Sequence, residues 1–242
     1  MGLKLVLFIL DKLRFLLSSK FAFTILLIIS EKFLFVPNQK KGLKRLKKSA
    51  MDDRDYIMNV DLQRSNKFEI SGHNYAKTFS KYLNNYRYTC KNLLEIGVLT
   101  GSSLCIWASM FPNSKIYGID IEKHYWNENI QKWTKKLGEQ NMSRISFVNR
   151  DLFTVVETSE IFDQTYFDII IDDGPHDITS ILRSFSLFQE RLSQDGIYIV
   201  EDNPGAIEDL RHLGKISNFR FFVENGLIIG KRNVKVNNVQ LI

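Results

Sequence analysis

Residues 92–107, "NLLEIGVLTGSSLCIW", contain the pattern that decides the fold. An apolar strand ends at Glu95 and Ile96, the glycines Gly97 and Gly101 follow, and an apolar helix begins directly after them. Glycines at a strand-to-helix turn let the backbone approach a ligand closely, and the first N–H groups of a helix attract a carboxylate. The same spacing also suits a tight turn that binds nothing, so the pattern predicts the strand–turn–helix unit more firmly than it predicts a site.

Strand and helix patterns alternate through the rest of the chain. Short apolar runs bounded by turn residues predict strands at Asn92–Ile96, Lys115–Asp120, Ile145–Asn149, Phe167–Asp172 and Ile197–Glu201. Helices are expected between them, at about 102–110, 126–139, 152–160, 177–193 and 205–213. The pair Asn225-Gly226 predicts a closing hairpin. The sequence therefore indicates an α/β protein with a doubly wound, Rossmann-like parallel sheet, in which ligands bind at the carboxyl ends of the strands.

Composition divides the chain into four parts. We expect an apolar and basic arm over 1–50, a linker and leading helix over 51–90, the α/β domain over 91–232 and a tail over 233–242. The formal net charge is +6, but residues 1–50 carry eleven Lys or Arg against Asp11 and Glu31, so the remaining 192 residues carry −3. A mildly acidic domain gives no electrostatic reason to expect a nucleic acid partner.

The arm has the character of a membrane-binding segment. Its longest uncharged run, Phe21–Ser30, would be about 15 Å long as a helix, roughly half of a ~30 Å hydrocarbon core. Six basic residues follow between Lys40 and Lys48, which suits an anionic cytoplasmic membrane surface. We expect a shallow anchor that leaves the domain in the cytoplasm. A spanning helix, and a helix packed on the domain or on a second copy in a homo-oligomer, remain open.

The two cysteines, Cys90 and Cys105, lie in apolar contexts and are expected to be core thiols, as in a reducing compartment. Just before the sheet, "SGHNYAKTFSKYLNNY" places Tyr75 and Phe79 near one face of a helix. From this position Tyr75 and His73 are expected to contribute to a lid over a ligand at the strand ends.

Single acids stand at three strand ends. Glu95 lies at a buried strand end and is expected to seek a cationic partner such as a ligand ammonium group. Asp120 follows the second strand, where a carboxylate can accept hydrogen bonds from ribose hydroxyls. Asp151 follows the third strand, in a position to accept from an adenine amino group. Taken singly, Asp120 and Asp151 suit turns and helix caps equally well.

Acid pairs follow the fourth and fifth strands. The stretch "FDIIIDDGPHDITS" contains Asp172 and Asp173, and "GIYIVEDN" contains Glu201 and Asp202. Neighbouring parallel strands bring their carboxyl ends together, and carboxylates at one point repel unless a cation lies between them. Oxygen ligands favour Mg²⁺, so Asp173, Glu201 and Asp202 are candidate metal ligands.

His176, three residues after Asp173, and Asp172, the first acid of its pair, are not among these candidate ligands. His176 is placed to accept a proton from a substrate hydroxyl, although an exposed turn residue with no such role is also open. Asp172 is open between a helix cap and a cofactor contact, and capping of the next helix is also open for Asp173.

These motifs together resemble class I S-adenosylmethionine-dependent methyltransferases over roughly residues 70–232. Glu95, Gly97 and Gly101 match the first motif of that family, and Ser103 falls where a hydroxyl can meet the methionine carboxylate. Asp120 matches the ribose acid. The resemblance implies a seven-stranded sheet whose last strand is antiparallel, with S-adenosylmethionine as the cofactor. The cofactor set is then Glu95, Gly97, Gly101, Ser103, Asp120, Asp151 and Asp173.

The segments "IIDDGPH" and "IVED" resemble a narrower group, the Mg²⁺-dependent sugar O-methyltransferases related to macrocin and mycinamicin methyltransferases. This resemblance implies that Asp173, Glu201 and Asp202 hold the metal and that His176 is the general base. The expected activity is methylation of a hydroxyl on a sugar, glycolipid or other glycosylated acceptor. A catechol-like metal-dependent O-methyltransferase of a small diol, and a non-catalytic membrane-tethered scaffold that binds the cofactor, are the alternatives.

Overall fold

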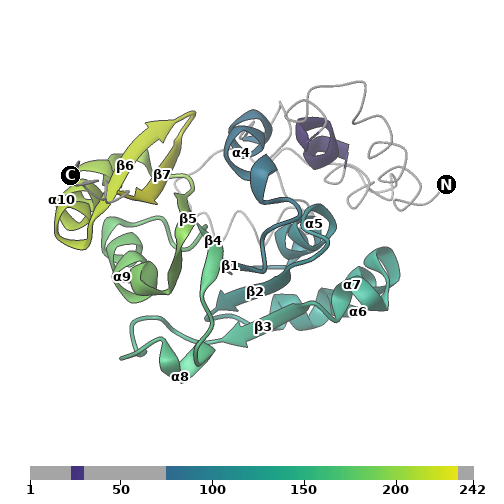
Figure 1. Ribbon diagram of the computed structural model, residues 1–242. Helices are drawn as coiled ribbons and strands as arrows, with labels where there is room; N and C mark the ends of the chain where they lie inside the picture. Colours follow the sequence, from purple (N-terminus) through teal and green to yellow (C-terminus); the bar gives the residue numbers. More distant parts are fainter. Residues whose placement is uncertain (1–22, 30–74, 234–242) are drawn as a thin grey trace, which may run out of the picture.

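The computed structural model describes residues 23–29 and 75–233 (Figure 1). Most of the expected arm, including the basic run from Lys40 to Lys48, and nearly all of the expected tail lie outside the described residues. His73, which is expected to contribute to a lid, lies outside them as well.

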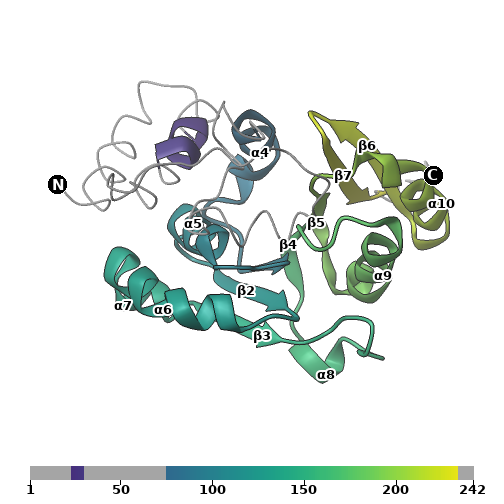
Figure 2. The ribbon, with the colours of Figure 1, turned by 180° about the vertical axis from the view of Figure 1, so that it is seen from behind.

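The described chain is built on one seven-stranded sheet (Figures 1 and 2). Its strands are β1 (Asn92–Ile96), β2 (Lys115–Asp120), β3 (Ile145–Asn149), β4 (Phe167–Asp172), β5 (Leu192–Val200), β6 (Phe219–Glu224) and β7 (Leu227–Arg232). They lie in the order β3-β2-β1-β4-β5-β7-β6. Strands β1 to β5 are parallel, whereas β7 is antiparallel to both β5 and β6. The predicted doubly wound sheet and the hairpin at Asn225-Gly226 are confirmed, because β7 folds back between β5 and β6.

Helices cover both faces of the sheet (Figure 1). They are α4 (Ala76–Leu83), α5 (Ser102–Met110), α6 (His124–Leu137), α7 (Glu139–Met142), α8 (Ser159–Phe162), α9 (Ile178–Phe188) and α10 (Ile207–Ser217). Short 3-10 turns are η1 (Asn84–Tyr86), η2 (Gln189–Arg191) and η3 (Pro204–Ala206).

The alternation of side chains along each strand divides the core in two. In β4, Ile169 and Ile171 pack with Phe79 and Trp107 of α4 and α5 on one face. Ile170, between them, packs with residues of α9 and α10 on the other face. Successive strand side chains point to opposite faces, so an apolar run such as "III" is buried on both sides. This explains why the central strands could be read from the sequence.

The segment predicted as a helix over 152–160 is mostly a turn, and α8 begins only at Ser159. Local side chains bind the backbone here: Phe153 N–H donates to Asp151 Oδ1 at 2.9 Å, and Glu157 N–H donates to Glu160 Oε1 at 2.9 Å. Such bonds give the backbone an alternative to helical pairing. The predicted helix was thus too long, whereas the predicted fifth strand was too short, because β5 begins at Leu192 and not at Ile197.

Residues 23–29 form a helical segment that packs against the domain. Phe23, Leu26 and Leu27 are at most 2% exposed and belong to the same core cluster as α4 and α5. The Phe23 and Phe111 rings lie 6.2 Å apart. For this part of the arm, the structure therefore favours packing on the domain, the third of the expected alternatives. Among the helices described, none combines the length and apolar character needed to cross a bilayer.

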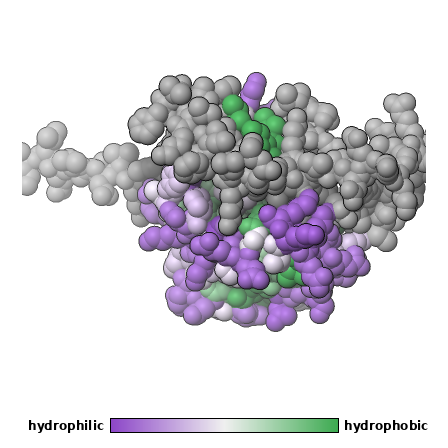
Figure 3. Space-filling model, turned by 90° about the vertical axis from the view of Figure 1, so that its right-hand side faces the viewer, coloured by the Kyte–Doolittle hydropathy of each residue, from purple (hydrophilic) through white to green (hydrophobic). Residues whose placement is uncertain are grey.

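In the lower half of the view in Figure 3 the described surface is mostly hydrophilic, with small apolar areas between polar ones, and a further apolar area lies at the top among the grey atoms. This side includes α6, whose buried residues Trp126, Trp133 and Leu137 recur at helical spacing. Lys135 lies on the exposed side of the same helix. An amphipathic helix of this kind packs one stripe on the sheet and leaves the opposite face in water.

Candidate functional site

The carboxyl ends of the parallel strands form one continuous edge, because the ladder continues past each strand. Gly97 N–H donates to Ile119 O at 2.9 Å and Asp173 N–H donates to Ile96 O at 2.8 Å. Glu201 N–H donates to Asp172 O at 2.9 Å. The residues that follow β1, β4 and β5 are thus held side by side, as the sequence predicts for neighbouring parallel strands.

The two glycines of the first motif are required by contacts inside the chain. Gly97 has φ +85°, and a Cβ there would lie 2.0 Å from the backbone oxygen of Asp173. Gly101 has φ +78°, and a Cβ there would lie 2.3 Å from the Trp126 ring. Both positions need glycine for its left-handed backbone and for space. The groups that approach these glycines belong to the chain itself, Asp173 and Trp126, and the approach of a ligand to this turn remains a prediction.

Glu95 and Ser103 meet across the glycine turn. Glu95 is fully buried, and the Ser103 hydroxyl donates to Glu95 Oε2 at 2.7 Å. A buried carboxylate needs donors or positive charge to offset its lost hydration, and Ser103 supplies one donor. The two predicted cofactor residues therefore belong to one hydrogen-bonded pair, and their contacts with a cofactor remain a prediction.

Asp120 organises the loop that follows β1. Its Oδ2 accepts from Val98 N–H at 2.7 Å and from Leu99 N–H at 2.9 Å, and its Oδ1 accepts from Glu122 N–H at 2.8 Å. Leu99 has φ +48°, so the carboxylate stabilises a loop conformation that a leucine rarely adopts. Asp120 thus lies where the sequence predicted, at the end of β2 beside the glycine turn.

Asp151 lies apart from the acids that follow β4 and β5. It follows β3, and β2 and β1 separate β3 from β4 in the sheet. Its Oδ1 accepts from Phe153 N–H in a local turn. The alternative role of helix cap is not realised, because α8 begins at Ser159.

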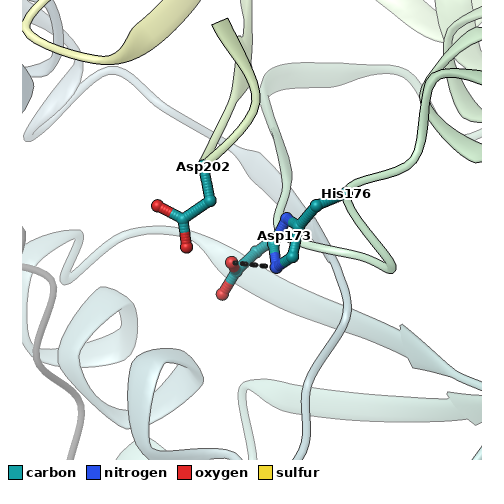
Figure 4. Close-up of side chains that lie close together, drawn as sticks. All are labelled: Asp173, His176 and Asp202. Atoms are coloured by element: carbon teal, nitrogen blue, oxygen red, sulfur yellow. Dashed lines mark ion pairs between the residues drawn. The ribbon is translucent and has the colours of Figure 1, made fainter. Parts of the chain in front are cut away.

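Asp173, His176 and Asp202 come together at the ends of β4 and β5 (Figure 4). One ligand atom from each lies within 4.8 Å of the others, and His176 Nε2 lies 4.0 Å from Asp173 Oδ1. His176 and Asp202 have φ of +64° and +62°. Left-handed backbone at residues other than glycine is uncommon and tends to occur at functional sites. Asn203 joins the two loops, because its amide donates to His176 O at 2.6 Å.

A second group shares Asp173 with the first. Ligand atoms of Glu95, Asp173 and Glu201 lie within 4.8 Å of one another. Glu201 is 1% exposed, whereas Asp202 beside it is exposed. Adjacent residues at a strand end point in different directions, so the predicted ligands Glu201 and Asp202 fall into different groups. The participation of Glu95 in an acid group was not predicted.

These residues fit a hard divalent cation. Two of the carboxylates, on Glu95 and Glu201, are almost completely buried close to Asp173. Like charges in so small a volume are costly unless a cation or a proton offsets them. Carboxylate oxygens at partly exposed strand ends suit Mg²⁺, which keeps several of its waters and leaves positions for a substrate oxygen. The His176 imidazole beside them is then outside the donor set, where it can accept a proton.

Tyr75, at the start of α4, reaches Asp202 from outside the sheet. Its hydroxyl donates to Asp202 Oδ1 at 2.6 Å. The pKa of Tyr75 is raised well above its usual range by burial, and further by this hydrogen bond and by the negative charges of Asp202 and Glu201. The hydroxyl therefore remains a donor at any ordinary pH.

Asp172 does not cap a helix, and it belongs to neither of the two acid groups. It is 2% exposed, and the Tyr198 hydroxyl donates to its Oδ2 at 3.0 Å. The cap of α9 is Asp177, which accepts from Ser180 N–H at 2.9 Å. Burial raises the pKa of Asp172 to about 7, against the lowering effect of its hydrogen bond with Tyr198.

This buried carboxyl predicts a pH dependence of stability. Because its folded-state pKa of about 7 lies above the ordinary value of 3.8, the folded protein binds the proton more tightly than the unfolded chain does. Stability from this group should be fully present below about pH 4 and should be lost as the pH rises through about 7, by about 2–4 kcal/mol in total. Asp172→Asn should remove this slope, as measured by urea unfolding with a chelator present. Parallel pH profiles for the two proteins would contradict the assignment.

Comparison with known proteins agrees with this architecture. Residues 94–203 match a family model described as a methyltransferase domain. The mycinamicin VI 2''-O-methyltransferase of Micromonospora griseorubida is 30% identical over 139 residues, which cover 54% of this chain and 31% of that protein. The demethylmacrocin O-methyltransferase of Streptomyces fradiae is 29% identical over 137 residues, which cover 54% of this chain and 32% of that protein.

Among solved structures, the MycE methyltransferase of mycinamycin biosynthesis, in complex with Mg and SAH, superposes with a TM-score of 0.53 at 22% identity. The match covers 69% of this chain and 51% of that one. The matched part of this chain thus spans about a third of the length of the two relatives compared by sequence. Strand order, antiparallel β7 and this superposition together show that the described chain has the fold of that methyltransferase, and residues 94–203 are similar to a methyltransferase domain.

Proposed function

We propose that this protein is an S-adenosylmethionine-dependent O-methyltransferase that acts, with Mg²⁺, on a hydroxyl of a sugar or other glycosylated acceptor. The observation that carries the proposal is the meeting of Asp173 with Asp202 and His176 at the ends of β4 and β5. Hydroxyl methylation needs a way to make the oxygen nucleophilic and a group to accept its proton. Carboxylates that suit a divalent cation, with an imidazole beside them, meet both needs.

The cofactor would occupy the edge from β1 to β3. In this proposal Glu95 and Ser103 receive the amino and carboxylate groups of its methionine part beside Gly97 and Gly101. Asp120 receives the ribose hydroxyls, and Asp151, two strands from β1, receives the adenine. The order β3-β2-β1-β4 supports this layout, since it places the expected adenine, ribose and methionine residues in sequence along one edge that ends at Asp173.

The reaction would be an in-line displacement at the methyl group. The bond from the sulfonium sulfur to the methyl carbon breaks as the bond from the acceptor oxygen forms, and His176 accepts the hydroxyl proton. Asp173 Oδ1 lies 4.0 Å from Nε2 of this imidazole. A bound divalent cation would supply Lewis acidity that lowers the pKa of the hydroxyl. The products are the methyl ether and S-adenosylhomocysteine.

The acceptor class rests on similarity. The two relatives compared by sequence are O-methyltransferases whose names refer to mycinamicin and macrocin. A further relative is named for O-methylation of a rhamnosyl group on tetracenomycin C. A hydroxyl on a glycosylated small molecule is therefore the acceptor we propose, with a glycolipid headgroup as one member of that class. Association of the arm over 1–50 with an anionic membrane, and formation of a homo-oligomer, stay predictions.

Calorimetric titration tests the proposal directly. S-adenosylmethionine should bind the wild-type protein, and Mg²⁺ should give a separate binding signal. A screen of free and lipid-linked glycosides with a labelled methyl group would then identify the acceptor. Cofactor binding without a Mg²⁺ signal would remove the metal from the mechanism. A protein that binds no cofactor would remove the methyltransferase proposal and leave the fold.

His176→Gln provides a test of the general base. Glutamine keeps a polar side chain of similar reach and cannot accept the proton, so kcat should fall by about a hundredfold to ten-thousandfold. Binding of S-adenosylmethionine should stay close to wild type, because His176 is placed away from the glycine turn in this proposal. The matched control is His212→Gln on α10, which should leave kcat unchanged. Equal activity of wild type and His176→Gln would contradict the assignment.

A further inference from the structure

Helix α4 is anchored to the opposite end of the chain, the β6–β7 hairpin. Lys81 Nζ lies 2.6 Å from Glu224 Oε2, and the Tyr82 hydroxyl donates to the same carboxylate. The Tyr82 and Phe222 rings lie 5.7 Å apart. These contacts link residues more than a hundred positions apart and hold α4 beside the sheet edge that carries the acids.

The ring of Tyr75 is packed between α4 and this hairpin. Tyr75 is 5% exposed, and its ring meets the Phe79 ring edge-on with centroids 6.3 Å apart. A Cβ on Gly226, in the hairpin turn, would lie 3.6 Å from the Tyr75 hydroxyl. With the ring held on both sides, the hydroxyl has a set position, and from there it donates to Asp202 Oδ1 at 2.6 Å.

The backbone of Asp202 lies farther from the paired strands than the backbones of Asp173 and Glu201 do. Asp173 and Glu201 each have a backbone N–H paired with a neighbouring strand. Asp202 lies one residue farther along, on an exposed loop with φ +62°. An exposed carboxylate on a loop samples several rotamers, and a fixed donor selects one of them.

A phenol suits this role better than a cationic side chain would. Lysine or arginine at this place would neutralise Asp202 and compete with a metal ion for it. A neutral hydroxyl binds one carboxylate oxygen and leaves the charge in place. Hydrogen bonds from surrounding groups to metal-ligating side chains commonly orient the ligands in this way.

We propose that Tyr75 is a positioning residue that orients the Asp202 carboxylate toward Asp173 and His176, and that the docking of α4 on the β6–β7 hairpin thereby assembles the metal site. This inference rests on the proposed function, since it assumes that Asp202 binds the metal. Tyr75 touches neither the cofactor nor the acceptor in this role and acts only through Asp202.

The test is Mn²⁺ and Mg²⁺ affinity, measured by calorimetry on the full chain without acceptor. Tyr75→Phe keeps the ring and its packing and removes the donor, so the metal dissociation constant should rise by about tenfold. Tyr86→Phe is the matched control, because it removes a tyrosine hydrogen bond, to the backbone oxygen of Asp195, that lies outside both the acid groups and the β6–β7 hairpin. Its metal affinity should stay within about twofold of wild type. Thermal unfolding with a chelator should show that both variants are folded.

A double-mutant cycle distinguishes positioning from a general effect on structure. In an Asp202→Asn background, Tyr75→Phe should cause no further loss of metal affinity, because the residue through which Tyr75 acts has already lost its charge. Equal affinities of wild type and Tyr75→Phe, or additive losses in the cycle, would overturn the positioning role and leave the proposed function intact. A wild-type protein that binds neither metal would overturn both this inference and the metal part of the proposed function.

Discussion

Asp173→Asn should abolish Mg²⁺ binding and lower methyl transfer by roughly a thousandfold, the equivalent of about 4 kcal/mol of transition-state stabilisation. Asp173 has the largest expected effect among the acids because it belongs to both groups, with His176 and Asp202 on one side and with Glu95 and Glu201 on the other. Asparagine has almost the same shape and keeps one oxygen, so the change removes little except the negative charge.

The backbone of Asp173 limits any rearrangement around such a substitution. Its N–H donates to Ile96 O at 2.8 Å, which ties it to β1. Binding should be measured by calorimetry and transfer with a labelled methyl group. Asp177→Asn is the matched control, because it removes a carboxylate four residues away on the same loop and retains a good helix cap for α9. It should bind Mg²⁺ like wild type. Retention of Mg²⁺ binding by Asp173→Asn would exclude Asp173 as a ligand.

Gly97→Ala should be the most damaging single change outside the acids. The new methyl group would lie 2.0 Å from the Asp173 backbone oxygen, and alanine would also be forced to φ +85°. Backbone strain and overpacking together should cost roughly 3–5 kcal/mol of folding free energy. Because the atom that must move belongs to Asp173, binding of S-adenosylmethionine and of Mg²⁺ should both be lost even where the variant folds.

Gly138→Ala separates the two causes. Gly138 has φ +82°, and a Cβ there meets nothing within 4 Å. This variant carries the backbone strain alone, roughly 1–3 kcal/mol, and should bind both ligands normally. Urea unfolding and calorimetry on the pair give the comparison. Equal stability of the two variants, with binding retained in Gly97→Ala, would show that the contact between Gly97 and Asp173 does not support the site.

For Tyr75 the sequence predicted a position near the strand ends but not the hydrogen bond to Asp202. Its position just before the sheet suggested a lid, and the structure places its hydroxyl on Asp202, 127 residues later in the chain. No local pattern links these two positions, because the contact exists only after α4 has docked against the β6–β7 hairpin. The same holds for the bond from Asn203 to His176 O.

The prediction of a helix over 152–160 was wrong for a different reason. Apolar spacing favoured a helix there, but Asp151 and Glu160 bind nearby backbone N–H groups and hold most of the segment in turns. Local competition of this kind depends on the rotamers of individual side chains, which periodicity does not describe.

The sequence by itself determined the alternation of strands and helices and the edge at which the acids gather. It also determined both ends of four of the five predicted strands. It could do so because strands buried on both faces have unbroken apolar sequences, and because the carboxyl ends of parallel strands lie at the same edge of the sheet. Only the tertiary structure decided which acids meet. Glu201 and Asp202 are adjacent in sequence and belong to different groups, and Glu95 joins one of them from β1. Side-chain direction at a strand end depends on the backbone angles there, and packing across the whole domain sets those angles.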